Sequence, residues 1–196
     1  MADDMRTVGV VGAGVMGTGL AQVLAQTGHE VILVDRTEEI LGRAARRRPG
    51  PALRQAAGRR CRDAVEPRGK VLERISYTTG YEGFERADFV VENVTEDWET
   101  KRGVYERIDP LCPEHCVFAA NTSVIPITRI GAATSRRDRV LGMHFMNPVP
   151  LKPTVEMVRG HHTSQATVDT ARRLLERMGK DAVLVEDSPG SSPTGC

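Results

Sequence analysis

Four residues of types that take part in proton transfer lie in or just after apolar, strand-like segments. Ser123 comes shortly after VFAA, His144 and Asn147 lie in VLGMHFMNP, and Glu156 lies in TVEMV. A histidine is a suitable general base, a carboxylate can orient it, and a hydroxyl can hydrogen-bond a substrate oxygen. Each type also has a structural explanation, as a buried histidine, a surface carboxylate or a helix cap. Their convergence at strand ends favours a catalytic site.

The stretch of residues 7–35 predicts a strand, a glycine turn, a helix, a second strand and a terminal acid. Gly12, Gly14 and Gly17 form G-x-G-x-x-G directly after the apolar run VGVV. The first glycine permits a tight turn, the second lets a pyrophosphate approach the main chain, and the third allows close packing of helix on strand. The helix expected over residues 15–27 directs its N-terminal N–H groups toward the phosphates. The stretch therefore predicts a dinucleotide site.

Asp35 ends the second strand of this unit, about 20 residues after the glycines, where an acid can accept hydrogen bonds from an adenosine ribose. A glycine turn that merely packs would leave this acid unexplained. The carboxylate would also repel a 2′-phosphate, so we expect NAD rather than NADP. Beside a nicotinamide, His144 and its neighbours would suit alcohol oxidation, in which the histidine takes the hydroxyl proton and the cofactor takes the hydride.

Strand-like and helix-like patterns alternate along the chain. Expected strands cover residues 8–11, 31–34, 75–78, 89–92, 117–120, 140–145, 155–158 and 182–185, and expected helices cover residues 15–27, 98–108, 126–132 and 165–178, with another beginning at residues 38–39. This alternation predicts one doubly wound α/β domain over residues 1–187, with a mostly parallel Rossmann-type sheet. Such sheets bind ligands beyond the carboxyl ends of their strands.

Bulk composition narrows the function classes. The net charge of +1 gives no indication of nucleic acid or membrane as a partner, and no apolar run approaches the roughly 18 residues of a membrane span. The four cysteines show no disulfide framework, so we expect reduced thiols in the cytoplasm. Cys112, His115 and Cys116 lack the spacing of a zinc finger, and we expect no metal. We expect His161 and His162, before a helix, to be exposed.

Residues 42–62 are rich in Arg, Ala, Gly and Pro and contain no acid. One interpretation is a basic patch for nucleic acid or phosphate, and the other is a solvated helix with an irregular insert. Because aromatic residues are absent and the whole chain is near neutral, the second interpretation is favoured.

The motifs GAGVMG, VENVTED, NTSVIPIT and HFMNPVPLKPTVEMVRG occur in this order between residue 6 and about residue 190, outside the stretch 42–62. In these motifs the chain resembles the N-terminal, NAD-binding domain of 3-hydroxyacyl-CoA dehydrogenases. The resemblance implies oxidation of a hydroxyacyl thioester and a homodimer, as in full-length relatives.

By position, the resemblance assigns roles to twelve residues. It implies that His144 is the catalytic base, Glu156 its carboxylate partner, and Ser123 the ligand of the substrate oxygen. Asn147 would support the substrate and the nicotinamide. The implied cofactor contacts are Gly12, Gly14, Val15, Met16, Gly17, Asp35, Glu96, Lys101, Ser123 and Asn147.

The chain departs from the family pattern in two places. The family commonly has Met-Lys-Leu at the positions where this chain has Lys152, Pro153 and Thr154. This difference affects the contacts with the acyl group that the resemblance implies. The family also continues past Asp-Ser-Pro-Gly into a helical domain, whereas this chain reads DSPGSSPTGC. Loss of one T from a reading frame that encodes Gly-Phe-Val-Ser-Asn-Arg would produce this ending. We therefore expect residues 188–196 to be a truncated, frameshifted tail and the helical C-terminal domain to be absent.

Three functional hypotheses follow. The first is oxidation of a 3-hydroxyacyl-CoA. The second is the same oxidation of a glyceryl unit on an acyl carrier protein, on the way to hydroxymalonyl or methoxymalonyl extender units, because VENVTEDWETK and NTSVIPIT resemble the polyketide subgroup of the family. The third is a catalytically inactive NAD-binding module.

Overall fold

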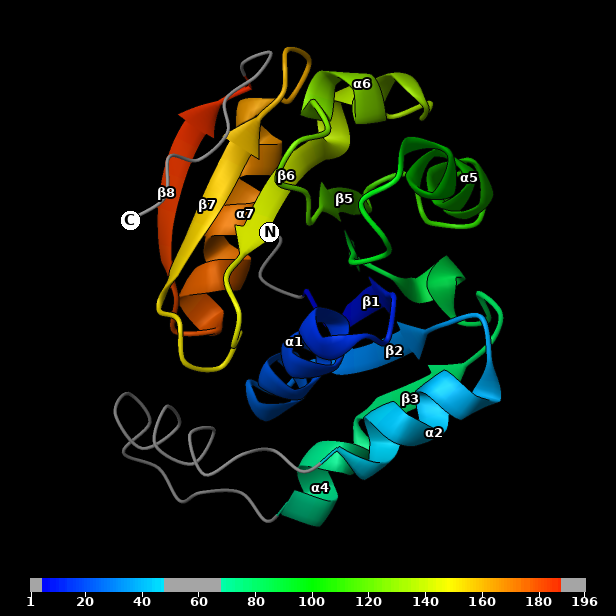
Figure 1. Cartoon of the computed structure of the whole chain (residues 1–196). Coiled ribbons are helices and arrows are strands. Elements are labelled where there is room, and N and C mark those ends of the chain that lie inside the picture. The colour runs from blue at the N-terminus through cyan, green and yellow to red at the C-terminus, as the bar shows by residue number, and fades with distance from the viewer. Residues whose placement is uncertain (1–4, 48–67, 188–196) are drawn as a thin grey trace.

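The computed structural model describes residues 5–47 and 68–187. The strands are β1 (Thr7–Val11), β2 (Glu30–Val34), β3 (Ile75–Thr78), β4 (Phe89–Glu92), β5 (Val117–Ala120), β6 (Val140–Phe145), β7 (Thr154–Arg159) and β8 (Asp181–Glu186). The helices are α1 (Val15–Gln26), α2 (Glu38–Arg46), α4 (Arg68–Glu73), α5 (Trp98–Ile108), α6 (Ile127–Ala132) and α7 (Gln165–Arg177), with short 3₁₀ turns η1 (Phe84–Arg86) and η2 (Arg137–Arg139). Figure 1 shows how these elements are arranged.

All eight of these strands form a single sheet in the order β3-β2-β1-β4-β5-β6-β7-β8. Neighbouring strands run parallel except β6 and β7, which are antiparallel. The central strands β1, β4 and β5 are buried at every residue, as expected of parallel strands covered on both faces. The doubly wound, mostly parallel α/β sheet predicted from the sequence is therefore confirmed.

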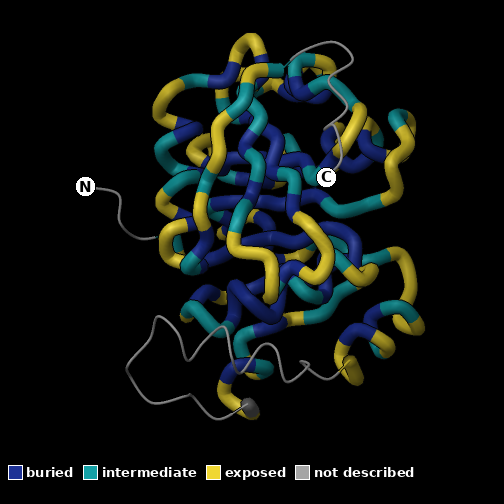
Figure 2. Tube along the Cα trace, turned by 60° about the vertical axis from the view of Figure 1, so that its left-hand side comes forward, coloured by how far each residue is buried: buried dark blue, intermediate teal, exposed yellow. Residues whose placement is uncertain are grey.

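Apolar side chains form two cores, one on each face of the sheet. Figure 2 shows that the buried parts of the chain lie mainly in the middle of the molecule, with exposed segments toward its outside. On one face, residues of α1, α2 and α7 pack against the strands, among them Leu20, Leu24, Leu41 and Leu174. On the other face α5 and α6 do the same, with Tyr105, Ile108, Ile127 and Ile130. Both faces of the sheet can be apolar because each is covered by the apolar stripes of these amphipathic helices.

The elements expected from the sequence are present, with ends that differ by one or two residues. Helix α1 ends at Gln26, and Gly28 follows with φ of +90°, the left-handed conformation that suits a glycine after a helix. Helix α4 and the two 3₁₀ turns were not predicted from the sequence.

Two sequence predictions fall largely on residues that the structure does not describe. Of the arginine-rich stretch 42–62, only residues 42–47 are described, and α2 continues through them to Arg46. The proposed frameshifted tail, residues 188–196, lies outside the described residues, and the domain boundary at residue 187 stays a prediction. Among the described helices, none is long and apolar enough to cross a membrane.

His29 lies fully buried at the junction of α1 and β2. Its Nδ1 atom is 3.0 Å from Thr27 Oγ1 and 3.2 Å from the carbonyl oxygen of Leu24, while Nε2 has no hydrogen-bond partner among the described residues. Burial, assisted by the charge of Arg177 and opposed by the Leu24 carbonyl, lowers the pKa of His29 below its ordinary value of 6.5. The folded protein therefore favours the neutral imidazole.

This burial predicts a contribution of His29 to acid destabilisation. Below pH 6.5 the unfolded chain takes up a proton that the folded chain excludes, so this part of the stability is lost as the pH falls toward the lowered pKa. The loss is at most about 1.4 kcal/mol per pH unit. Urea unfolding of the wild type and of His29→Phe at about pH 7.5 and about pH 5.5 should show a smaller loss in the variant. Equal losses in the two proteins would contradict this account.

Candidate functional site

The glycine turn between β1 and α1 leaves no room for side chains at two of its three glycines. Gly12 has φ of +98°, and a Cβ atom on it would lie 2.7 Å from the carbonyl oxygen of Asn93. A Cβ atom on Gly17 would collide with the carbonyl oxygen of Gly12. Gly14, in contrast, faces open space, with no atom within 4 Å of an added Cβ. These are the properties of a cradle that an anionic group approaches at Gly14, beside the N-terminus of α1.

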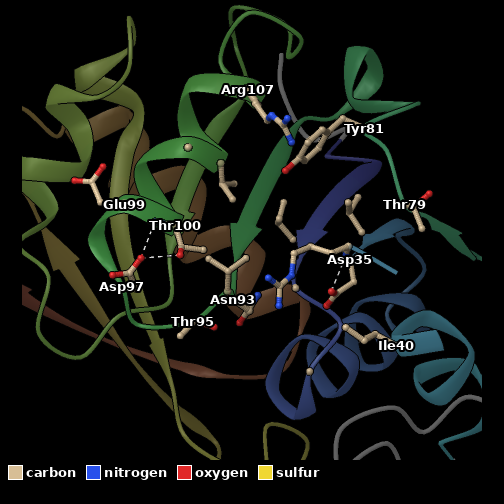
Figure 3. A pocket seen from close by; sticks show the side chains of 18 residues that line it. Asp35, Ile40, Thr79, Tyr81, Asn93, Thr95, Asp97, Glu99, Thr100 and Arg107 are labelled. Atoms are coloured by element: carbon tan, nitrogen blue, oxygen red, sulfur yellow. Dashed lines mark hydrogen bonds between the residues drawn. The ribbon is translucent and has the colours of Figure 1, made fainter. Parts of the chain in front are cut away.

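Asp35 lies at the end of β2, beside this turn. Its Oδ2 atom accepts a 2.6 Å hydrogen bond from the Ala13 amide, and Oδ1 accepts one of 2.7 Å from the Arg36 amide. Both oxygens retain a further lone pair that can accept a hydroxyl. Asp35, Gly12 and Gly14 line one cleft of about 920 Å³, which is large enough for a nucleotide (Figure 3).

Among the residues of this cleft that were not predicted from the sequence are two side chains that interact electrostatically. Tyr81, in the loop after β3, and Arg107, on α5, lie together at its rim (Figure 3). Burial raises the pKa of the Tyr81 hydroxyl, and the positive charge of Arg107 opposes this rise. Neither residue belongs to a recognisable motif. The only sequence signal for them is their position. Tyr81 follows β3, and Arg107 lies on α5, the helix that follows β4.

A second cleft of about 440 Å³ adjoins the first. Asn93 and Val94 line both clefts, so the two are neighbours at the carboxyl ends of the strands. The second cleft is also lined by Met16, Glu96, Asn121, Ser123, His144, Phe145, Met146 and Asn147. Three of the four predicted catalytic residues thus lie beside the nucleotide cleft.

His144 lies between a hydroxyl and a carboxylate. Its Nε2 atom is 3.0 Å from Ser123 Oγ, and its Nδ1 atom is 3.5 Å from Glu156 Oε2. The antiparallel register of β6 and β7 pairs His144 with Glu156, so their side chains point to the same face of the sheet. With Nδ1 protonated toward Glu156, Nε2 is the basic nitrogen, and it faces the hydroxyl of Ser123.

Glu96 fixes the turn that carries Ser123. One carboxylate oxygen, Oε1, accepts hydrogen bonds from Thr122 Oγ1 and from the amides of Ser123, at 3.2 Å, and Val124, at 3.3 Å. These contacts join the loop after β4 to the loop after β5. The resemblance had implied that Glu96 contacts the cofactor. Glu96 does line the second cleft, and a direct contact stays a prediction.

Asn121 connects the ends of three neighbouring strands. Its Nδ2 atom donates to Asn93 Oδ1 at 2.9 Å, and its Oδ1 atom accepts from the Phe145 amide at 3.2 Å. The amide group therefore ties the end of β5 to the ends of β4 and β6. Because His144 immediately precedes Phe145, this contact also restrains the main chain at the histidine.

Lys101 is fully buried, and its ammonium is occupied within the protein. Nζ lies 2.8 and 2.9 Å from the two carboxylate oxygens of Glu92 and 3.1 Å from the carbonyl oxygen of Asn121. The amide of Val94 donates to the same Glu92 carboxylate at 2.6 Å. Burial raises the pKa of Glu92, and Lys101 and the Val94 amide oppose that rise. No part of this lysine is exposed to the cleft. The contact of Lys101 with the cofactor, which the resemblance implies, stays a prediction.

The other residues singled out in the sequence have ordinary surroundings. Val15 is half-exposed at the start of α1, and Met16 beside it lines the second cleft rather than the first. Cys112 and Cys116 are buried, while His115 Nε2 lies 3.0 Å from Asp88 Oδ1. No group of three or more possible metal ligands occurs among the described residues. The paired histidines His161 and His162 are exposed, as expected.

The contrast between Gly14 and Gly17 gives a test of the cradle. Gly17→Ala should lower stability by about 1–3 kcal/mol, because its methyl group would displace the main chain at Gly12. Gly14→Ala should keep stability within about 1 kcal/mol of the wild type, because its φ of −66° suits alanine and its surroundings are open. The same methyl group would obstruct a pyrophosphate and weaken NADH binding about tenfold or more.

Thermal unfolding and NADH fluorescence titration of both variants measure these effects. Normal NADH affinity in a folded Gly14→Ala protein would show that the phosphates do not approach at this position.

Comparisons with known proteins agree with this geometry. The chain matches the family described as 3-hydroxyacyl-CoA dehydrogenase, NAD binding domain, over residues 7–188. It is 40% identical over 188 residues to a probable 3-hydroxybutyryl-CoA dehydrogenase of Bacillus subtilis, and the match covers 95% of this chain and 64% of that protein. It is 39% identical to the mitochondrial hydroxyacyl-coenzyme A dehydrogenase of Sus scrofa, with 95% and 60% covered.

Among solved structures, the (S)-3-hydroxybutyryl-CoA dehydrogenase of Ralstonia eutropha superposes with a TM-score of 0.82 at 36% identity, covering 95% of this chain and 65% of that one. The chain thus spans somewhat less than two thirds of the length of these relatives. The glycine cradle and Asp35 fit the dinucleotide that the family description names, and the cofactor is NAD. The chain belongs to the 3-hydroxyacyl-CoA dehydrogenase family and comprises its NAD-binding domain.

Proposed function

We propose that the protein takes part in the NAD-dependent oxidation of the 3-hydroxyl group of a hydroxyacyl thioester. The observation that carries this proposal is the line from Glu156 through His144 to Ser123. His144 and Ser123 line a cleft that adjoins the cleft at the glycine turn. A general base held between a carboxylate and a hydroxyl is well placed to remove a proton from an alcohol. The names of the relatives support the thioester as the substrate class.

In the proposed reaction, each polar residue has one task. Ser123 donates a hydrogen bond to the substrate oxygen, and His144 Nε2 takes the proton from the hydroxyl group. Glu156 stabilises the imidazolium that forms and keeps the ring oriented. Asn147, at the edge of the cleft, supports the substrate and the nicotinamide. Bound NAD supplies the acceptor for the hydride.

Apolar side chains beside the polar residues suit an acyl substrate. Val124, which follows Ser123, is 68% exposed, and Met146, which lines the second cleft, is 46% exposed. Leu151, in the same loop as Met146, is 49% exposed. These side chains offer apolar surface to an acyl chain whose hydroxyl group reaches His144.

A carrier comparison tests the proposed function. The protein is incubated with NAD and either 3-hydroxybutyryl-CoA or a glyceryl-acyl carrier protein, and the formation of NADH is followed by absorbance. We expect turnover of the CoA thioester. Faster turnover of the carrier-protein substrate would replace CoA by the protein carrier in the proposal. NADH binding without turnover of either substrate would contradict an oxidoreductase and support an inactive NAD-binding module.

The assignment of the base predicts the effect of two substitutions. His144→Gln should lower kcat by about 10²–10⁴, the usual contribution of a general base. Glu156→Gln should lower kcat less, because the histidine remains but the imidazolium loses its neighbouring carboxylate. His162→Gln, a change at an exposed histidine, is the matched control and should leave kcat unchanged. A near-normal kcat in His144→Gln would remove this residue from the mechanism.

A further inference from the structure

The loop between β6 and β7 carries one of the proposed functional residues. Asn147 and Met146, at its start, line the second cleft. Within the loop, the amides of Leu151 and Lys152 donate to the carbonyl oxygen of Pro148 at 3.0 and 3.2 Å and form a tight turn. This turn leaves other carbonyl groups of the loop directed into the protein, where they need donors.

Lys180 provides those donors. Its Nζ atom lies 2.7 Å from the carbonyl oxygen of Val149 and 2.7 Å from that of Lys152. Lys180 is only 6% exposed, and burial lowers the pKa of its ammonium to about 8. A buried lysine is costly unless its hydrogen bonds are well satisfied, so these two contacts compensate a real desolvation penalty.

The position of Lys180 itself is fixed by the end of α7 and the start of β8. Gly179 has φ of +68°, and the Lys180 amide donates to the carbonyl oxygen of Leu175 at 2.8 Å. The next amide, that of Asp181, donates to the carbonyl oxygen of Pro153 at 2.8 Å. The lysine therefore projects from the end of α7 directly behind the loop.

The other side of the loop rests on α1. Val149 is 2% exposed and belongs to the core that α1 and α7 share. A Cβ atom added to Gly19 of α1 would lie 3.5 Å from Val149 Cβ, an ordinary contact distance, so the loop approaches this helix closely. Lys180 thus holds, by two hydrogen bonds, a segment that also packs against α1, the helix that begins at the glycine turn.

We propose that Lys180 is a positioning residue for the reaction, holding the carbonyls of Val149 and Lys152 and so placing Asn147 beside the nicotinamide end of the cleft. This inference rests on the proposed function, because Asn147 acts there on substrate and cofactor. Lys180 itself touches neither. It acts only through the loop, two residues beyond Asn147, where a small displacement of the main chain moves the amide group.

The central experiment compares Lys180→Met, which keeps the apolar stem and removes the donors, with Lys70→Met. Lys70 is exposed on α4, outside both clefts, and serves as the matched control. We expect Lys180→Met to lower kcat about 10- to 100-fold, since misplacement of a supporting group by about 1 Å has effects of this size. The affinity for ADP-ribose, which lacks the nicotinamide, should stay within about twofold of the wild type, whereas NADH binding weakens. Lys70→Met should change none of these quantities.

A double-mutant cycle with Asn147→Ala tests whether the lysine acts through the asparagine. If it does, Lys180→Met should change kcat by less than about twofold in the Asn147→Ala background. Effects that multiply, an unchanged kcat in Lys180→Met, or a parallel loss of ADP-ribose and NADH affinity would each overturn the proposal.

Two further outcomes are also decisive. Lys180→Gln is shorter but retains two N–H donors, and it should restore part of the lost activity. If neither Lys180→Met nor Lys180→Gln folds, the lysine is required for the fold rather than for positioning, and the proposal is wrong. If the wild type turns over no thioester, the proposed function fails. The ratio of NADH to ADP-ribose affinity in Lys180→Met then still tests the positioning of the loop.

Discussion

The buried ion pair between Glu92 and Lys101 is the interaction on which the rest of the site depends. Both side chains are fully buried, and the ammonium bridges the end of β4 to the end of β5 from α5. Burying two charges has a large desolvation cost, and removal of one partner leaves the other uncompensated, at a cost of about 3–5 kcal/mol. The hydroxyl of Tyr105, 3.4 Å from Glu92, adds a further restraint, and burial together with the Glu92 charge raises the pKa of Tyr105 well above its usual value. The pair thus fixes the strand ends that form the floor of the clefts.

Two further groups above this ion pair hold the residues of the cleft in place. Glu96, four residues after Glu92, holds the turn that carries Ser123, and Asn121 holds the main chain next to His144. The cleft side chains therefore take their positions from groups that lie beneath them, before any ligand binds. Because of this preorganisation, the distance between the base and the hydroxyl is set by the protein before the substrate binds.

Much of the fold could be predicted because the sequence expresses it locally. Apolar runs such as FVVE and VFAA indicate buried parallel strands, and the turn glycines indicate a position where a Cβ atom does not fit, as found at Gly12 and Gly17. Helix α4, with the sequence RGKVLE, shows no apolar stripe and was not predicted. The convergence of Ser123 and His144 could also be anticipated, because parallel strands bring their carboxyl ends to one edge of the sheet.

The sequence by itself thus determined the class of fold, the glycine cradle, the acid at the end of β2 and the set of residues available for proton transfer. Only the tertiary structure decided which of these residues face the clefts and which hold them from below. Lys101 is the clearest case: the structure buries its ammonium against Glu92, while the contact with the cofactor stays a prediction. Lys180 is another, since its two acceptors are main-chain carbonyls about 30 residues earlier in the chain. Such contacts depend on how distant segments pack together, and local sequence patterns do not indicate that packing.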